Sequence, residues 1–445
     1  MDHYLTKDSP SKAISRFALP MVVGSLFQQI YTLVDSAVVG KYVGEAALAS
    51  IGASFALTTI FICIGVGGGA GASVLIARYF GSRDYKRMKT AIFTAITGFL
   101  VLSLGLSAFG LIFSKDLMGL LQTPEEILDM AVLYLNIYFY GLPFLFMYNI
   151  ISALYQALGE SKIPLYFLIF SSVLNVILDV YFVRDLGFGL AGAAYATLLA
   201  QGLSAVLSFF VFLRKIKTIK TEQTKIFDKR EFALVSKLAL PSIVQQSTIT
   251  IGQLLVQSVV NSFGVEILAG FSAAMRVESL IIVPITSLGN ALSSYTSQNV
   301  GAEKLDRLEK GLRASLIMVG IYSLLVFSLL KINSTSIIAF FMNKSSSNLA
   351  TETGMAYLNF IGFFFVLVGS KHCIDGVLRG LGDVRVFTFA NIVNLFIRVS
   401  LSMTLAHKIG IGMVWYAVPL GWLANLLISS LYYGHTKKRG YELSF

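Results

Sequence analysis

Charged residues are scarce in this sequence. Only 13% of its 445 residues are Asp, Glu, Lys or Arg, whereas soluble domains carry about 25%. So few charges cannot cover a water-exposed surface of this size. Apolar residues make up 56% of the chain, and its mean hydropathy is +0.74. These values exclude a soluble protein and indicate one that uses lipid as its solvent.

Cysteine is scarce as well. Cys63 and Cys373 are the two present, and both fall inside long apolar runs. This position excludes a disulfide framework and a cysteine-ligated metal cluster. The net charge of +11 does not indicate a nucleic-acid partner, because the basic residues lie in alternate loops. We therefore expect no nucleic-acid partner and no resident cofactor or metal.

Twelve apolar runs are long enough to cross a bilayer, which takes about 20 residues. Six lie in the first half, at residues 13–39, 46–77, 89–113, 128–156, 163–183 and 189–213. Six lie in the second half, at residues 232–262, 267–298, 311–331, 353–378, 385–407 and 412–434. Most Lys and Arg residues lie in the two tails and in the loops after the even-numbered runs. By the positive-inside rule, both chain ends are then cytoplasmic, and the protein is expected in a bacterial-type inner (plasma) membrane.

The two halves also resemble each other. SRFALP at residues 15–20 returns as SKLALP at residues 236–241, and Tyr134-Leu135-Asn136 returns as Tyr357-Leu358-Asn359. Internal repeats of this kind are typical of secondary transporters. Six runs per half predict parallel repeats, related by an axis along the membrane normal, with a central cavity between them.

The expected fold class is therefore an all-α integral membrane protein. It would have twelve transmembrane helices in two pseudo-symmetric six-helix lobes around a central cavity. We place the N-terminal lobe at residues 1–213 and the C-terminal lobe at residues 232–445. A cytoplasmic basic linker at residues 214–231 would join them.

Five segments carry a family resemblance: Ala18-Leu19-Pro20, LVDSAVVG at 33–40, NVILD at 175–179, QNVGA at 298–302 and LRGLGD at 378–383. They occur in order across essentially the whole chain, which resembles the multidrug and toxic compound extrusion (MATE) family. The resemblance implies two six-helix lobes that export compounds against an inward H⁺ or Na⁺ gradient. It says little about the substrate.

Four polar residues are expected at one membrane depth in the first half. Asp35 and Asp179 lie at similar distances from the outer ends of their runs, and Asn175 lies one helical turn before Asp179. Thr197 lies at a comparable depth on the next run. A charged residue at the bilayer centre costs at least about 2.5–3.5 kcal/mol, so each carboxylate needs a reason to be there. The oxygens of this set suit a hard cation, and the pair of carboxyl groups could hold a proton instead.

The DinF-like branch of the MATE family has its cation site in this lobe. Its Asp, Asn, Asp and Thr pattern fits Asp35, Asn175, Asp179 and Thr197, which the resemblance thus implies to be cation-coupling residues. The alternative is that each side chain only caps or hydrogen-bonds a neighbouring helix.

The second half serves as a control for that alternative. The positions that match the four residues hold Val256, Arg398, Ser402 and Leu420. No Asp or Glu occurs between Lys237 and Glu266 on its first run. If the carboxylates served the fold alone, the second half would need them too. The pattern therefore favours one coupling site, in the first half.

Two polar stripes are expected to line the substrate cavity. Gln28 and Tyr31 share a helical face with Asp35, and Gln246, Gln253 and Gln257 form a comparable stripe in the second half. A polar stripe on an apolar span should face a wet cavity rather than lipid. Hydrogen bonding between helices is the alternative reading of both stripes.

The remaining charges inside the apolar runs favour pairing over contact with a substrate. Lys371, Asp375 and Arg379 recur every fourth residue and can neutralise one another. His372 could sense pH or form a hydrogen bond in a cavity. The roles of these residues stay open.

One acidic residue of the second half has two candidate partners. Glu278 can pair with Arg276 or with Arg398, and the sequence does not decide between them.

The favoured function is a cation-coupled antiporter, not an enzyme, that exports amphipathic and often cationic organic compounds by alternating access. It would work as a monomer in the bilayer, with H⁺ or Na⁺ as the coupling ion. The alternative is a lipid-linked oligosaccharide or lipid flippase of the related superfamily. A passive channel would not need a carboxylate cluster confined to one lobe.

Overall fold

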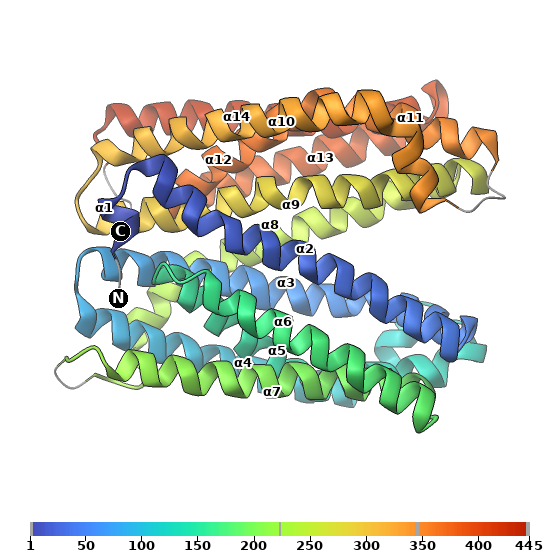
Figure 1. Ribbon diagram of the computed structural model, residues 1–445, viewed down its shortest axis with the longest axis horizontal. Helices are drawn as coiled ribbons and strands as arrows, with labels where there is room; N and C mark the ends of the chain where they lie inside the picture. Colours follow the sequence, from blue (N-terminus) through green and yellow to red (C-terminus); the bar gives the residue numbers. More distant parts are fainter. Residues whose placement is uncertain (1–2, 222–223, 343–346, 442–445) are drawn as a thin grey trace. The chain divides into compact units, whose positions relative to one another are not determined.

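The computed structural model describes residues 3–221, 224–342 and 347–441, and these residues form helices and no β-strand (Figure 1). The first half holds α1 (Tyr4–Lys7), α2 (Pro10–Tyr42), α3 (Glu45–Gly81), α4 (Tyr85–Leu120), α5 (Glu125–Ala157), α6 (Lys162–Asp179), η1 (Val180–Asp185) and α7 (Gly189–Lys217). The second half holds α8 (Lys229–Asn261), α9 (Val265–Gly301), α10 (Asp306–Phe341), α11 (Asn348–Ile361), η2 (Gly362–Phe364), α12 (Phe365–Leu381), α13 (Val384–Ile409) and α14 (Gly412–Lys438). Each predicted apolar run coincides with one helix or with consecutive helical segments, which confirms the all-α fold.

Eleven of these segments, among the described residues, are long and apolar enough to cross a membrane. The predicted span that is not among them is α8, although its 33 residues are long enough. Its polarity sets it apart, because it carries Gln245, Gln246, Thr248, Thr250, Gln253 and Gln257. The same polar stripe that the sequence assigns to a cavity wall thus lowers the hydropathy of this helix.

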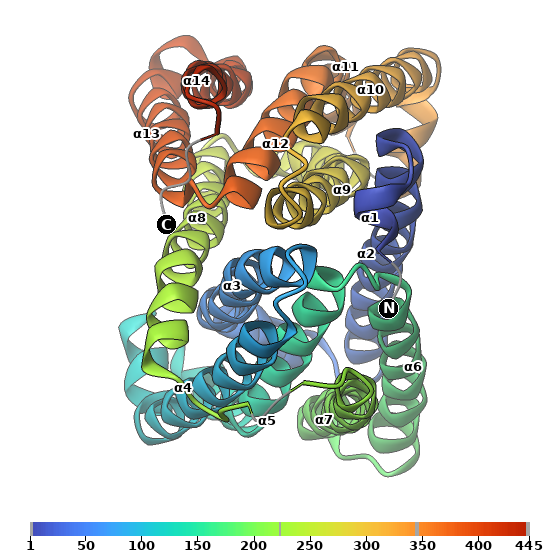
Figure 2. The same cartoon turned by 90° about the vertical axis from the view of Figure 1, so that its left-hand side faces the viewer.

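The two halves repeat the same packing. In the first, α5 packs against α3, α4 and α7, and α6 packs against α7. In the second, α12 packs against α9, α10 and α14, and α13 packs against α14 (Figures 1 and 2). Helices at matching places in the two repeats therefore make matching contacts, as duplication predicts.

The chain divides into two compact units, but the division does not fall in the linker. One unit is Val23–Ile243, and the other combines the described residues up to Val22 with those from Val244 onward. Both α2 and α8 therefore begin in one unit and end in the other. The crossing points follow Pro20 and Pro241, the prolines at matching places inside these two helices. The predicted lobe limits, which include residues outside the described part, stay a prediction.

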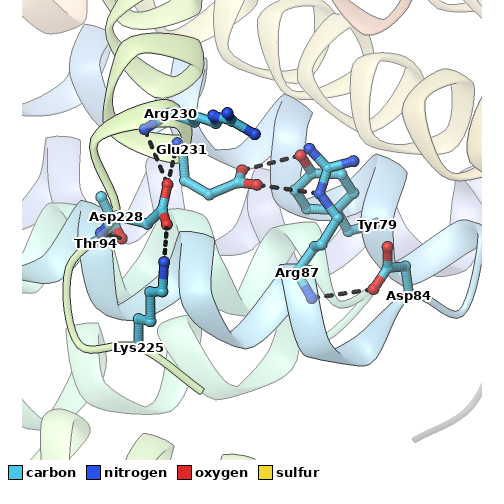
Figure 3. Close-up of polar contacts among 8 residues, drawn as sticks. All are labelled: Tyr79, Asp84, Arg87, Thr94, Lys225, Asp228, Arg230 and Glu231. Atoms are coloured by element: carbon cyan, nitrogen blue, oxygen red, sulfur yellow. Dashed lines mark hydrogen bonds and ion pairs between the residues drawn. The ribbon is translucent and has the colours of Figure 1, made fainter. Parts of the chain in front are cut away.

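Hydrogen bonds hold the start of α8 in the first unit. Glu231 is buried and accepts hydrogen bonds from Tyr79 Oη at 2.9 Å and from Arg87 Nε at 3.2 Å (Figure 3). We call these three residues the α8 latch. Because Tyr79 ends α3 and Arg87 opens α4, the latch ties α8 to the turn between those helices.

The residues just before α8 are fixed as well. Asp228 accepts hydrogen bonds from the backbone N–H groups of Arg230 and Glu231, and its own N–H donates to Thr94 Oγ1 (Figure 3). Lys225 pairs with the Asp228 carboxylate at 2.9 Å. An acidic residue in this position is a helix N-cap, which satisfies the free N–H groups of the first turn. The described end of the predicted linker is thus an ordered start of α8.

A similar arrangement holds α1 and the residue after it, just before α2, in the second unit. Asn299 Nδ2 donates to the carbonyl of Leu5 at 3.0 Å, and Arg307 Nε donates to Asn299 Oδ1 at 2.8 Å. Arg307 also donates to the carbonyl of Asp8, and Lys304 donates to the carbonyl of Thr6 at 2.9 Å. These residues come from the turn between α9 and α10, the repeat counterpart of the turn that holds α8.

Small residues let α3 and α8 approach closely within the first unit. A Cβ added to Gly67 would lie 2.6 Å from the Cα of Ile243, and one added to Gly71 would overlap the backbone of Ala239. Glycine at these positions therefore allows backbone-to-backbone contact between the helices.

Candidate functional site

The structure brings the four predicted coupling residues together. Asp35 comes from α2, Asn175 and Asp179 from α6, and Thr197 from α7, all within the first unit. The carboxyl groups of Asp35 and Asp179, here called the acid pair, lie within hydrogen-bonding reach of each other. A carboxylate has no donor, so a hydrogen bond within the acid pair requires one shared proton.

Asn175 connects the acid pair to α7. Its side-chain nitrogen can donate to Asp179 Oδ2 at 2.8 Å, while its oxygen accepts from Thr197 Oγ1 at 3.1 Å and from the Thr197 N–H at 3.0 Å. Asn175 is 1% exposed and Asp179 is fully buried. The buried carboxylate is thus held in one orientation by the residue one turn before it.

Two oxygens of the acid pair have no hydrogen-bond donor among the residues that the structure describes. They are Asp35 Oδ1 and Asp179 Oδ1, and both are buried. Buried polar atoms are seldom left unsatisfied, because removing them from water costs free energy that only a partner returns. Two carboxylate oxygens beside an amide and a hydroxyl are the kind of ligands that a proton or a hard cation such as Na⁺ requires.

Two tyrosines complete the surroundings of the acid pair. Tyr31 is hydrogen-bonded to Thr197, and both Tyr31 and Tyr134 lie close enough to Asp35 and Asp179 to interact with them electrostatically. From the sequence, Tyr31 is predicted to line the substrate cavity, and Tyr134 is only a marker of the repeat. Nothing but that repeat distinguishes Tyr134 among the 20 tyrosines.

A π-helical segment begins immediately after Asp179. In η1 the N–H of Leu186 bonds to the carbonyl of Tyr181, five residues back, at 2.9 Å. Val183 of η1 packs into a small apolar cluster with Val39 of α2 and Leu190 of α7. Short π-helical segments are rare and occur often at functional sites. The sequence does not predict this segment, because no residue type in it signals one.

The predicted cavity residues fall in two different units. Gln28 and Tyr31 belong to the first, and Gln246, Gln253 and Gln257 to the second. Gln28 and Gln253 are exposed, while Gln257 donates to Asn261 Oδ1 at 3.2 Å on its own helix. A shared cavity lined by these five residues stays a prediction.

The second half has no acid pair at the matching positions. Val256 is 1% exposed and belongs to the hydrophobic core, and Ser402 is fully buried. The acidic residue of this region is Glu278 of α9, which accepts a hydrogen bond from Tyr357 Oη at 2.5 Å. Glu278 has two candidate partners. Arg398 is close enough to interact with it electrostatically, whereas the side chain of Arg276 is exposed.

The predicted neutralisation of Lys371 and Asp375 is confirmed. Lys371 Nζ lies 3.0 Å from Asp375 Oδ2 and donates to Asn391 Oδ1 at 2.9 Å. Ser429 Oγ donates to the other oxygen of Asp375 at 2.9 Å. This buried network joins α12, α13 and α14, so it forms a structural connection within the second unit.

Arg379 interacts electrostatically with Asp375 but makes its hydrogen bonds elsewhere. It donates to Asn290 Oδ1 at 2.6 Å and to Ser293 Oγ at 3.2 Å, which connects α12 to α9. His372 lies near the charges of Lys371 and Arg379 on the same helix.

A duplicated set of membrane-spanning helices is the architecture of membrane transporters built from internal repeats. One family model matches it twice, over residues 20–181 and 241–404. The chain belongs to the MatE family.

Similar proteins cover nearly the whole chain. It is 29% identical over 441 residues to a probable multidrug resistance protein, YpnP, of Bacillus subtilis (strain 168), covering 98% of each. It is 24% identical over 440 residues to the multidrug export protein MepA of Staphylococcus aureus (strain N315), covering 96% of this chain and 95% of MepA. A solved structure of a multidrug-resistance MATE transporter in an outward-facing conformation has a TM-score of 0.90, with 24% identity and 98% of each chain covered. The two-lobed, twelve-helix fold is that of this family.

Proposed function

We propose that the protein is a DinF-like cation-coupled antiporter that exports amphipathic, often cationic organic compounds. The observation that carries this proposal is the acid pair, which has two buried oxygens without a partner among the described residues, whereas Val256 and Ser402 stand at the matching positions of the second unit. A transporter that used both halves alike would need a site in each. The names of YpnP and MepA support multidrug export as the substrate class.

The coupling step follows from where the ligands are attached. Asp35 is carried by α2, whereas Asn175 and Asp179 are carried by α6 and Thr197 by α7. With the site ionised, repulsion between the two carboxylates favours separation of α2 from α6. Binding of H⁺ or Na⁺ removes that repulsion and draws α2 toward α6 and α7. The ion thus acts by its different affinity for the two positions of α2, as any ligand-driven change requires.

In the proposed cycle, the substrate lies in the cavity lined by Gln28, Tyr31, Gln246, Gln253 and Gln257. Tyr31 lies one turn from Asp35 on α2 and is hydrogen-bonded to Thr197, so a shift of α2 would change the cavity wall. Ion binding from outside then displaces the substrate outward, and ion release to the cytoplasm resets the protein. The proposed site of action is a plasma membrane, with both chain ends cytoplasmic and one chain sufficient.

The test is efflux of a fluorescent organic cation from proteoliposomes, driven separately by a pH gradient and by a Na⁺ gradient. Wild type is expected to respond to one gradient, and Asp35→Asn and Asp179→Asn are expected to lose that response while still inserting. Asp185→Asn is the matched control, because this carboxylate is exposed and paired with Arg184. Gradient-driven efflux that persists in Asp35→Asn would overturn the coupling site. A wild type that responds to neither gradient would favour the flippase.

A further inference from the structure

Two tyrosines occupy equivalent positions in the two repeats, one in each half of the chain. Tyr134 of α5 and Tyr357 of α11 both belong to the repeated Tyr-Leu-Asn sequence. Each lies beside ionisable side chains of its own unit. Tyr134 lies near Asp35 and Asp179, and Tyr357 lies near Glu278 and Arg398.

The charge content of the two locations is different. Around Tyr134 there are two acidic groups, and the other polar side chains that contact the acid pair are neutral. In the described part of the chain, the charged groups that act on Tyr357 are the carboxyl of Glu278 and the guanidinium of Arg398. Since Arg398 matches Asn175 in the repeat, the basic residue stands where the first half places the amide beside the acid pair.

Glu278 is enclosed by apolar and aromatic groups. It is 4% exposed, and among the described residues its side chain accepts a hydrogen bond from Tyr357 alone. The Tyr357 ring packs edge-on against Phe271 and Trp415, with centroids 5.1 and 5.9 Å away, and its hydroxyl lies 3.7 Å from Met275 Sδ. A carboxylate in such surroundings needs a counter-charge or a proton, because a buried unpaired charge is strongly unfavourable.

The nearby counter-charge is Arg398 of α13. Arg398 lies within electrostatic range of Glu278 and Tyr357, and its buried Nε has no hydrogen-bond partner in the described part of the chain. Ser402, one turn further along α13 and the counterpart of Asp179, is fully buried, and its hydroxyl has no partner there either. The positive charge of the Arg398 guanidinium can therefore offset the negative charge of the Glu278 carboxylate.

We propose that Arg398 is a resident cation that fills, in the second half, the role of the exchangeable ion in the first. A guanidinium cannot lose its proton in a protein and cannot leave. Glu278 is then neutralised throughout the cycle, and the second half takes up no ion. This inference rests on the proposed function of the acid pair, and it explains why a duplicated protein couples through one half.

The test creates the missing site by removing the resident cation. Purified protein is prepared with the first-half site disabled by Asp35→Asn and Asp179→Asn, so the outcome does not depend on that site. Arg398→Gln is then added, and the melting temperature is measured against Na⁺ concentration and, separately, against pH. Arg398→Lys keeps the charge, and Arg276→Gln removes an exposed arginine of the same half.

The expected result is a new cation dependence in the Arg398→Gln protein alone. Its melting temperature should rise by an amount on the order of 2 °C for each tenfold rise in Na⁺ or H⁺ above the dissociation constant. The dependence should disappear when Glu278→Gln is added, and both control variants should show none. A folded Arg398→Gln protein without any new cation dependence would overturn the proposal.

A variant that does not fold still tests the charge balance. If Arg398→Gln fails because Glu278 is left unbalanced, the double variant Arg398→Gln/Glu278→Gln must recover folding. A double variant that remains unfolded, or that loses as much stability as the two single changes added together, contradicts the proposed charge balance. Failure of the antiporter proposal would be seen separately, as gradient-driven efflux that persists in Asp35→Asn.

Discussion

The side-chain amide of Asn175 lies 2.8 Å from the carboxylate of Asp179, one turn later on the same helix. The pair is buried where α6 changes into the π-helical segment η1. Because Asn175 also contacts Thr197, the amide fixes the position of the carboxylate relative to α7. The orientation of Asp179 thus depends on a neutral neighbour that carries no charge of its own.

Replacing Asn175 with Ala should weaken the proposed ion coupling without abolishing it. The change removes a donor from a buried carboxylate, which costs about 1–3 kcal/mol, or on the order of tenfold in ion affinity. The measurement is the ion concentration that half-saturates efflux in proteoliposomes. Ser171→Ala is the control, because Ser171 lies one turn earlier and bonds only to its own helix. Equal effects of the two changes would contradict a specific role for the amide.

Replacing Glu231 with Gln should destabilise the start of α8. Glu231 is buried and accepts a charge-assisted hydrogen bond from Arg87 and another from Tyr79, and such bonds contribute about 1.5–3 kcal/mol. We expect a lower melting temperature and faster proteolysis near residue 229. Arg230→Gln is the control, since the Arg230 side chain is exposed. Unchanged protease sensitivity in Glu231→Gln would mean that the α8 latch does not hold the helix.

Acid should loosen the segment before α8 through Asp228. The Lys225 ammonium and the backbone N–H groups of Arg230 and Glu231 hold the pKa of Asp228 below its ordinary value. A lowered pKa in the folded state stabilises folding above the unfolded pKa of about 3.9, and this stability is lost as the pH falls through the folded value. Asp228→Asn should therefore differ from wild type above about pH 4 and converge with it at lower pH. Hydrogen exchange of the first turn of α8, followed against pH, measures this. If the difference in hydrogen exchange between wild type and Asp228→Asn stays constant with pH, Asp228 is excluded as the titrating group.

Two glycines of α3 should respond in opposite ways to Ala. Gly71→Ala places a Cβ on the backbone of α8 at Ala239, which no rotation of a side chain can relieve. We expect destabilisation of about 1–3 kcal/mol, typical of overpacking. Gly52→Ala meets no atom within 4 Å and should be neutral or stabilising by up to about 1 kcal/mol, because Ala favours helix. The melting temperatures of Gly71→Ala and Gly52→Ala test this difference in stability. A similar fall in melting temperature in both variants would contradict the close packing of α3 on α8.

The sequence was sufficient to predict which residues meet at the acid pair. Asp35, Asn175, Asp179 and Thr197 lie far apart in the chain, yet their depths in the bilayer could be compared because membrane helices have a fixed rise per residue. The repeat also shows that neither carboxylate recurs in the second half, where Val256 and Ser402 stand at the matching positions. Depth, helical face and duplication together bring the four residues to one place.

Other features could not be predicted from the sequence. The π-helical turn after Asp179 arises from tertiary packing, including that of Val183 against α2 and α7, and has no local sequence signature. Tyr134 faces the acid pair because of how α5 is rotated in its bundle, which apolar periodicity on a mostly buried helix does not fix. The division of α2 and α8 between the units goes with contacts of Glu231 and Asn299. Glu231 looks in the sequence like an ordinary polar residue near a helix end. Asn299 belongs to the QNVGA segment, but that segment does not indicate a contact with Leu5.

The division of α2 and α8 has a consequence for how the protein is made. A ribosome that has finished the first six spans has not yet synthesised Glu231, which anchors the last segment of the first unit. The amino-terminal residues, including Leu5 and Asp8, must in turn wait for Asn299 and Arg307. Neither half of the duplicated gene therefore encodes a unit that is complete on its own.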